Sequence, residues 1–352
     1  MSLSFNLIRW CMTLVLLPAL LLMGGIAGAT DCGTQVAMKG KDGKMLRARQ
    51  FDDGSIVVRA PLAVNPDGGP ASYTVGDHGF TYMANGLDAW RNGKRETCDG
   101  TCTRAFKVAE AAGFAAGTAE FCVFGMEVEP LKPNQERTLC PAGAVVGNGR
   151  GRLVLGEMLQ TVGSGNVQAY RSTTSLQHIV SGQRRYLNSE TIPIAVTPRV
   201  DLLGHIVWVG GAGMHGTYAI VGDKGPAFGE GSIALHQLVR EGSVTSQQPG
   251  PIPAAKRCID GEMALKPPFE SRPDGGRSDR CKAGYTAKSD ADVRAYVGID
   301  HDLDFVIMGK ATLERKANVI QTEVTITSIE GIARAGGYDD DAIRRMIACL
   351  KD

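Results

Sequence analysis

The chain has 352 residues, a formal net charge of +1, and nearly equal numbers of basic and acidic side chains, 38 and 37. A nucleic-acid-binding protein needs a basic surface, so this balance argues against a nucleic-acid partner. Glycine is abundant, with 45 residues, and aromatic residues make up only 6%, which together favour a mainly β fold with many turns.

Residues 1–29 predict a secretory signal peptide. Arg9 precedes an apolar stretch from Trp10 to Met23, and Ala27–Ala29 has the small-residue pattern of a cleavage site before Thr30. The apolar stretch is too short for a membrane span. We therefore expect a secreted or periplasmic protein that has no stable membrane insertion after cleavage and is about neutral once Arg9 is lost.

Eight of the nine cysteines remain when Cys11 leaves with the signal peptide. An even number in an exported protein predicts up to four disulfides, whose pairing the sequence does not determine. Cys98 and Cys102 lack a second ligand pair, so we expect neither a zinc site nor a cofactor. A bond between Cys258 and Cys281 would close a local loop rich in Pro, Gly and Arg. The disulfide candidates are Cys32, Cys98, Cys102, Cys122, Cys140, Cys258, Cys281 and Cys349.

Short apolar, β-branched stretches between turn residues predict strands along most of the chain. Gly211–Gly216 satisfies the G-x-G-x-x-G pattern, but a strand follows it rather than a helix, so it predicts a hairpin turn. The expected strands are Ser55–Ala60, Gly79–Gly86, Arg152–Leu159, Ile192–Val196, His205–Val209, Tyr218–Val221, Phe305–Met308 and Val319–Ile329.

Two segments predict helices. Ala105–Ala119 is alanine-rich and lies in a cysteine-bracketed insertion, residues 92–150. Asp339–Asp341 precede apolar residues at helical spacing, as at the start of a short C-terminal helix that Cys349 can pin. The expected organisation is a signal peptide at 1–29, a β domain with its insertion at 30–310, and a strand and helix extension at 311–352.

Asp223 and Glu230 are the candidate catalytic residues. They lie seven positions apart, each beside a glycine, in a glycine-rich loop that follows the predicted strand Tyr218–Val221. Glycine lets a substrate approach the backbone closely, so such a carboxylate pair suits general acid and base catalysis. The alternative is a solvated turn that merely carries two acids, and spacing alone favours this alternative.

Three separated stretches of the sequence contain motifs that together resemble one protein family. The first is the turn Asn65-Pro-Asp-Gly-Gly-Pro-Ala-Ser-Tyr73 with Tyr82–Asn85, the second is Tyr170–Leu176 with Arg184–Pro193, and the third is Thr217–His236. In this order they resemble the chitosanases of glycoside hydrolase family 75 and their bacterial relatives. The resemblance covers residues 55–238, with gaps.

The resemblance implies a six-stranded double-psi-type β-barrel that hydrolyses β-1,4-linked glucosamine polymers internally and with inversion. It implies Asp223 and Glu230 as the two essential carboxylates, with carboxyls roughly 6.5–9.5 Å apart. We assign Glu230 as the general acid and Asp223 as the base that activates water, although the sequence does not determine which carboxylate has which role. The expected partner is chitosan or a related amino-sugar polymer. The candidate substrate-binding residues are Asp67, Tyr73, Tyr82, Arg185 and Glu190.

Some alternatives stay open. Arg184 and Arg185 are as well suited to pairing with Glu190 as to contacting substrate, and a buried tyrosine with a satisfied hydroxyl is more common than one that stacks on sugar. The chain departs from the family in having Asn65 at the first position of the turn, the cysteine-rich insertion, and about a hundred residues after Leu238. A peptidoglycan-active enzyme and a non-catalytic glycan-binding module are the competing functions.

Overall fold

The computed structural model describes residues 32–41, 43–70, 87–91, 94–96, 112, 120–123, 125–130, 151–161, 165–244 and 298–350. The predicted signal peptide, the predicted strand at 79–86 and the proposed Cys258–Cys281 pair lie outside these residues. So does the predicted helix at 105–119, except for Ala112, which lies in a turn.

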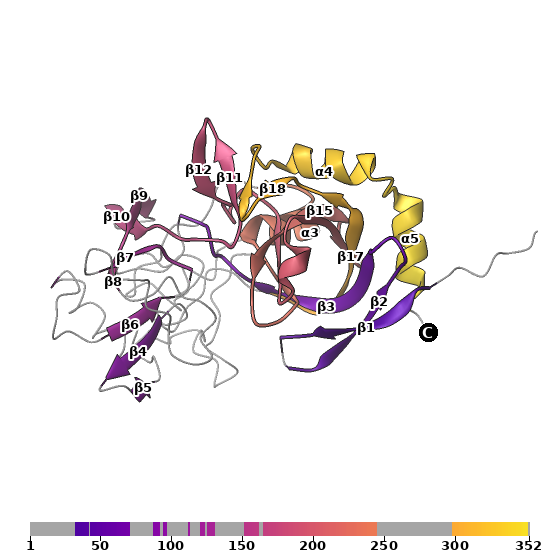
Figure 1. Ribbon diagram of the computed structural model, residues 1–352, viewed down its shortest axis with the longest axis horizontal. Coiled ribbons are helices and arrows are strands. Elements are labelled where there is room, and N and C mark those ends of the chain that lie inside the picture. The colour runs from indigo at the N-terminus through magenta and orange to yellow at the C-terminus, as the bar shows by residue number, and fades with distance from the viewer. Residues whose placement is uncertain are drawn as a thin grey trace, which may run out of the picture. The chain divides into compact units, whose positions relative to one another are not determined.

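Six strands form a closed barrel (Figure 1). Their order is β3-β16-β13-β15-β14-β17, and pairing of β17 with β3 closes the ring. The pairs β13–β15 and β16–β3 are parallel, and the other neighbouring pairs are antiparallel. The predicted mainly β fold with a six-stranded barrel is therefore confirmed. The strands are β3 (Ile56–Val64), β13 (Ile194–Thr197), β14 (His205–Gly210), β15 (Thr217–Lys224), β16 (Glu230–Gly231) and β17 (Ile299–Thr312).

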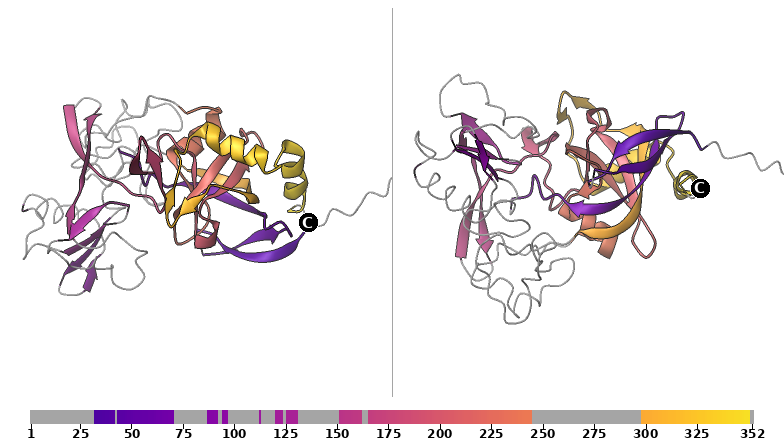
Figure 2. Two further views of the ribbon diagram at one scale, coloured as in Figure 1. Left: turned by 45° about the horizontal axis from the view of Figure 1, so that its top comes forward. Right: turned by 90° about the horizontal axis from the view of Figure 1, so that it is seen from below.

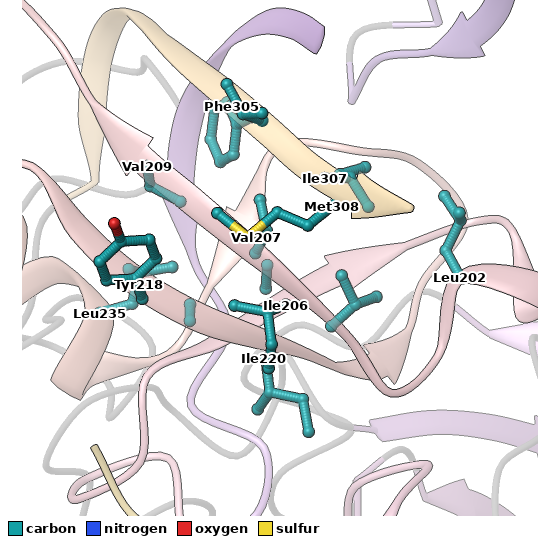
Figure 3. Packing of buried hydrophobic residues seen from close by; sticks show 14 of the residues in the cluster. Leu202, Ile206, Val207, Val209, Tyr218, Ile220, Leu235, Phe305, Ile307 and Met308 are labelled. Atoms are coloured by element: carbon teal, nitrogen blue, oxygen red, sulfur yellow. The ribbon is translucent and has the colours of Figure 1, made fainter. Parts of the chain in front are cut away.

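The barrel is stabilised by apolar side chains from all its long strands. Figure 3 shows some of those from β14, β15 and β17. Phe305 of β17 meets Phe228 edge to face, with ring centroids 5.0 Å apart, and both side chains are fully buried. The seam between β3 and β17 also carries an ion pair, in which Arg59 Nε donates to Asp304 Oδ1 at 2.7 Å. Burial of each large apolar side chain contributes about 1.5–3 kcal/mol, so this core determines the fold.

Further strands lie outside the ring. The hairpin of β1 (Thr34–Lys39) and β2 (Met45–Gln50) extends the sheet from β3. A second sheet combines β11 (Gln177–Val180) and β12 (Gln183–Tyr186) with β19 (Val319–Ile320) and β18 (Arg315–Lys316). The described strands between β3 and β11 are β4 (Leu87–Arg91), β5 (Lys94–Glu96), β6 (Glu120–Val123), β7 (Val128–Pro130), β8 (Gly151–Leu153), β9 (Leu155–Thr161) and β10 (Gly165–Tyr170).

Two helical segments lie between the barrel strands. The short 3₁₀ helix η1 (Val200–Leu202) precedes β14. Helix α3 (Ile233–Glu241) begins after Ser232, whose hydroxyl accepts from Leu235 N, and ends at Gly242 in the left-handed conformation. Gly211–Gly216 joins the antiparallel strands β14 and β15, so the hairpin-turn prediction is confirmed.

The predicted strand Val319–Ile329 is largely wrong. Only Val319–Ile320 is extended, and α4 (Ile326–Ala335) follows. A capping box explains the difference. Thr325 and Ser328 exchange side-chain and backbone hydrogen bonds, and this pair starts a helix despite the alternating apolar pattern. Helix α4 packs against β15 and β17 (Figure 2).

The predicted C-terminal helix is confirmed as α5 (Asp340–Ala348). Asp339 caps it by accepting from Ala342 N, and Asp340 and Asp341 complement its positive end. A disulfide joins Cys349, just after α5, to Cys32, just before β1. The bond spans 317 positions in the sequence, so it clamps the two ends of the described chain together.

Removing this disulfide tests its contribution. Replacing both Cys32 and Cys349 by serine should lower the free energy of unfolding by about 2–5 kcal/mol, because the unfolded chain regains the entropy that the cross-link removes. Urea denaturation of the purified variant and the parent measures this change. An unchanged midpoint would show that the bond does not constrain the unfolded state.

Candidate functional site

The three stretches that resemble one family meet in space. Ser175, from the second stretch, donates to Asp223 of the third through both its backbone N–H and its hydroxyl. Asn65, from the first stretch, donates to Glu230 of the third. The first and second stretches also contact each other, since Ser189 Oγ donates to Pro66 O at 2.7 Å. Segments far apart in the sequence thus converge on the candidate carboxylates.

Strand β13 places the two carboxylates on either side of Val196. Val196 pairs with Asp223 in β15 across one edge of β13 and with Glu230 in β16 across the other. Two strand spacings separate the Cα atoms of the two acids, which amounts to roughly 9–10 Å. Gly225 lies beside the same site, because a Cβ there would stand 2.8 Å from Val196 Cγ1 and 3.6 Å from Glu230 Oε2.

Asp223 is almost completely buried, with 7% of its surface exposed. Three donors converge on its Oδ1 atom: Ser175 Oγ at 2.6 Å, Ser175 N at 2.8 Å and Lys224 N at 2.9 Å. Among the described residues, none donates to Oδ2. Burial raises the pKa of Asp223, and the nearby charge of Glu230 adds to the rise, while the hydrogen bonds from Ser175 and Lys224 oppose it. Burial wins, so Asp223 holds a proton to higher pH than an ordinary aspartate.

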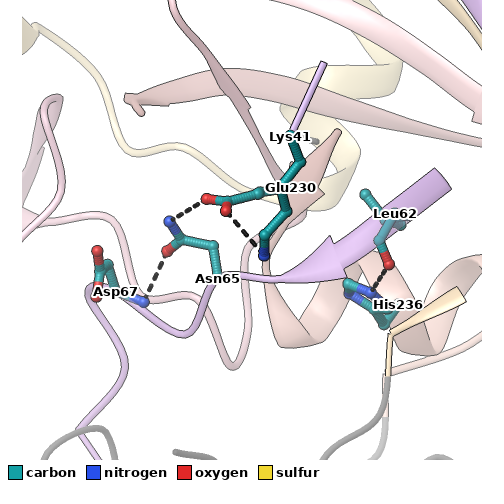
Figure 4. Close-up of polar contacts among 6 residues, drawn as sticks. All are labelled: Lys41, Leu62, Asn65, Asp67, Glu230 and His236. Carbon is teal, nitrogen blue, oxygen red and sulfur yellow. Dashed lines mark hydrogen bonds and ion pairs between the residues drawn. The ribbon is translucent and has the colours of Figure 1, made fainter. Parts of the chain in front are cut away.

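Glu230 has a different environment (Figure 4). Its Oε1 atom forms an ion pair with Lys41 Nζ at 3.1 Å, and its Oε2 atom accepts a longer bond, 3.4 Å, from Asn65 Nδ2. Lys41 comes from the turn between β1 and β2, outside the barrel. The side chain of Glu230 is 15% exposed and that of Lys41 is 52% exposed, so the pair lies at the surface of the site.

Asn65 links Glu230 to Asp67. Its side-chain oxygen accepts from Asp67 N at 3.0 Å, while its amide nitrogen faces Glu230 (Figure 4). The family turn has an aspartate here, which would place a further acceptor against Glu230. Asn65 therefore supplies a hydrogen-bond donor to Glu230 that an aspartate at this position would lack.

The other predicted substrate-binding residues divide into three groups. Glu190 lies against the Asn65–Pro70 turn, since a Cβ on Gly69 would stand 3.1 Å from its Oε1 atom. Arg185 lies on the exposed β11–β12 hairpin, where its guanidinium donates to Gln183. Tyr73 and Tyr82 lie outside the described residues.

The sequence analysis did not predict the contacts of Ser175 and Lys41 with the two acids, and it placed Asp223 in a loop. Asp223 lies at the end of β15 and not in the following loop, because the parallel pairing with β13 extends through Lys224. Ser175 lies within Tyr170–Leu176, but no motif in the sequence indicates that it contacts a carboxylate. Lys41 sits in a turn almost 190 positions before Glu230, so only the folded chain brings the two together.

Among the described residues, no cluster of three or more His, Cys, Asp or Glu side chains is arranged to bind a metal ion. Of the helices in this part of the chain, none is long and apolar enough to cross a membrane.

No protein-family model matches the chain, and no curated protein matches it.

Asp223 should reduce stability at neutral pH. Its pKa in the folded protein lies above the ordinary value of 3.8, which the unfolded chain keeps. Between these two pKa values the folded chain binds more protons than the unfolded chain, so the free energy of unfolding falls as the pH rises through this range. Asp223→Asn removes this penalty and should raise the free energy of unfolding at pH 7 relative to the parent. Urea titrations at pH 7 and pH 3.5 measure the gain, which should vanish at the lower pH.

The exposed Asp302 provides the matched control. Asp302→Asn should change stability little at either pH. If Asp223→Asn were less stable than the parent at pH 7, the buried carboxylate would be a net stabilising group and the account of its burial would be wrong.

His236, in α3, should make the fold sensitive to acid. Its Nε2 atom lies 2.9 Å from Leu62 O (Figure 4), and its Nδ1 atom lies 2.9 Å from Ser232 O. These two carbonyl contacts favour the charged ring, but burial outweighs them and lowers the pKa of His236 from 6.5 to about 4. Between these values the unfolded chain binds a proton that the folded chain does not, so stability falls as the pH falls. The full loss is about 3 kcal/mol.

Comparison with His236→Gln isolates this effect. The variant should lose up to about 1.4 kcal/mol per pH unit less than the parent between pH 6.5 and 4. His301→Gln, at an exposed position of β17, should keep the parent's slope. Equal slopes for parent and His236→Gln would mean that His236 titrates alike in both states.

Proposed function

We propose that the protein is a glycoside hydrolase that cleaves β-1,4-linked glucosamine polymers by inversion. The observation that carries the proposal is the placement of Asp223 and Glu230 across Val196, two strand spacings apart. Residues paired with Val196 project from the same face of the sheet, and Cα atoms roughly 9–10 Å apart allow their carboxyl groups to take the 6.5–9.5 Å separation that an inverting pair needs.

The two carboxylates also differ in environment, as acid–base catalysis requires. Burial raises the pKa of Asp223, whereas Glu230 lies against an ammonium group. An inverting hydrolase needs one group that gives a proton to the leaving oxygen and one that takes a proton from water. Two neighbouring acids in unlike surroundings, one buried and one beside an ammonium group, are suited to these two roles.

A glucosamine polymer suits the charges around the site. Each sugar of chitosan carries an ammonium group, which carboxylates attract. The backbone N–H of Asp67 donates to the Asn65 side chain, and Glu190 lies against the Asn65–Pro70 turn that contains both residues. Asp67 and Glu190 thus add two acids to the segments that surround Asp223 and Glu230, where Lys41 forms an ion pair with Glu230.

The competing functions fit less well. A binding module or a solvated turn has no need of a buried carboxylate whose pKa is raised, because such a group destabilises the fold without contributing to binding. A lytic enzyme that uses one acid does not require the second carboxylate across Val196. The paired arrangement therefore favours hydrolysis by two groups.

Activity on chitosan tests the proposal directly. The parent should release reducing ends from chitosan and not from purified cell wall. Glu230→Gln and Asp223→Asn should each reduce kcat/KM by about 10²–10⁴-fold, because each removes one proton-transfer group. Initial rates by reducing-sugar assay, with product lengths by chromatography, provide the measurement.

Glu241→Gln and Asp302→Asn provide matched controls, since both positions are exposed and lie outside the site. Both should retain parental activity. Cleavage of cell wall in place of chitosan would support the peptidoglycan alternative. Binding to chitosan without turnover at any pH, unchanged in the two site variants, would support the binding module and refute the enzyme.

A further inference from the structure

We propose that Ser175 is a positioning residue for Asp223 and that it leaves Oδ2 of Asp223 as the oxygen that reacts. This inference rests on the proposed function, because it concerns how one of the two candidate catalytic carboxylates is held. The observation that carries it is the unequal distribution of hydrogen-bond donors between the two oxygens of Asp223.

The two oxygens of Asp223 have opposite surroundings. Oδ1 accepts from Ser175 Oγ at 2.6 Å, from Ser175 N at 2.8 Å and from Lys224 N at 2.9 Å. Oδ2 accepts no hydrogen bond from the part of the chain that the structure describes. In that part, Oδ2 is not one of the side-chain oxygens that are fully buried without a hydrogen bond, so it reaches the surface. The small exposed fraction of Asp223 therefore includes Oδ2.

Buried neighbours hold Ser175 against β15. Leu176 N donates to Gly222 O at 3.0 Å, so the residue after Ser175 is bonded to the residue before Asp223. On the other side of Ser175, Thr174 Oγ1 donates to Leu176 O at 2.6 Å. The side chains of Thr174 and Leu176 are both buried. A fixed segment of backbone therefore brings the Ser175 hydroxyl to Asp223.

A purely structural role for the Ser175 hydroxyl explains less of its contacts. The hydroxyl accepts from Lys224 N at 2.9 Å, but Lys224 N also donates to Asp223 Oδ1, so this N–H group keeps an acceptor without the hydroxyl. The proton of the hydroxyl goes to Asp223 Oδ1, and at 2.6 Å this is the shortest of the three bonds to that oxygen. The distinct effect of the hydroxyl is thus on the carboxyl group of Asp223.

Donors gathered on one oxygen fix the direction of the carboxyl group. The torsion between Cβ and the carboxyl carbon of an aspartate is soft, so the carboxyl plane swings unless contacts hold it. The three donors on Oδ1 of Asp223 hold this plane with Oδ2 facing outward. Water or a substrate oxygen can then meet Oδ2 without displacing a donor, in either proton-transfer role. Because misplacing a reacting group by about 1 Å can cost about 100-fold in rate, this orientation matters for catalysis.

Ser175→Ala tests the positioning role, because it removes the hydroxyl and keeps both backbone donors to Asp223. On chitosan, kcat should fall by about 10–100-fold while KM stays within about twofold of the parent, since the carboxyl group is misdirected and the substrate contacts remain. Ser175→Thr keeps a hydroxyl and should recover most of kcat. A rise in KM with kcat unchanged in Ser175→Ala would show that Ser175 binds substrate directly and would overturn the positioning role.

Ser55→Ala provides the matched control for the loss of a serine hydroxyl. The Ser55 hydroxyl is buried, lies 2.8 Å from the Tyr338 hydroxyl and accepts from Gly309 N at 3.0 Å, and these partners lie outside the candidate site. Its removal should lower the urea midpoint of unfolding and leave kcat unchanged. A fall in kcat as large as that of Ser175→Ala would show that the loss of any such hydroxyl suffices, and it would refute the specific role of Ser175.

A double variant shows whether Ser175 acts through Asp223. In the Asp223→Asn background the group that Ser175 positions is already absent, so adding Ser175→Ala should lower the residual kcat by less than about twofold. The same loss of about 10–100-fold in both backgrounds would mean that Ser175 acts independently of Asp223, and it would overturn the inference.

Crystal structures of the variants keep this inference separate from the proposed function. In the parent and in Ser175→Thr, one oxygen of Asp223 should face residue 175 and the other should face solvent, whereas in Ser175→Ala the carboxyl plane should adopt a second orientation. If the parent does not cleave chitosan, the proposed function fails while these structures still decide whether Ser175 orients Asp223. A single, parental orientation of Asp223 in Ser175→Ala would overturn the inference whatever the activity.

Discussion

The pairing of β13 with strands on both of its edges is the constraint on which the candidate site depends. Val196 joins Asp223 on one side and Glu230 on the other, so the spacing of hydrogen-bonded strands sets the separation of the two acids. A slip of one residue on either edge would send one carboxylate to the opposite face of the sheet. The buried barrel core prevents such a slip, because it would also expose the apolar side chains of β15.

The same fold connects the two ends of the described chain to the candidate site. The disulfide between Cys32 and Cys349 fixes the start of β1, and Arg49 adds to this by donating to Cys32 O at 2.6 Å. The β1–β2 hairpin then carries Lys41 to Glu230. The disulfide between Cys32 and Cys349 thus helps to position the Lys41 ammonium beside Glu230.

The sequence predicted the features that depend on local patterns or on order along the chain. The turn at Gly211–Gly216, the acidic start of α5 and most barrel strands follow from periodicity and turn residues. The strand predicted at Val319–Ile329 failed because a capping box outweighed alternation. Contacts such as Lys41 with Glu230 depend on tertiary folding, and neither residue carries a local signal for the other. The family resemblance stays a prediction.

The most direct test of the central claim is the anomeric configuration of the first product. If Asp223 and Glu230 act across an intervening water, hydrolysis of a β-linked glucosamine oligomer must invert the reacting carbon. Proton NMR during the first minutes of reaction should then show the α-anomer of the new reducing end before mutarotation produces the β-anomer. Initial release of the β-anomer would contradict the account, because it would require one carboxylate to act as a nucleophile.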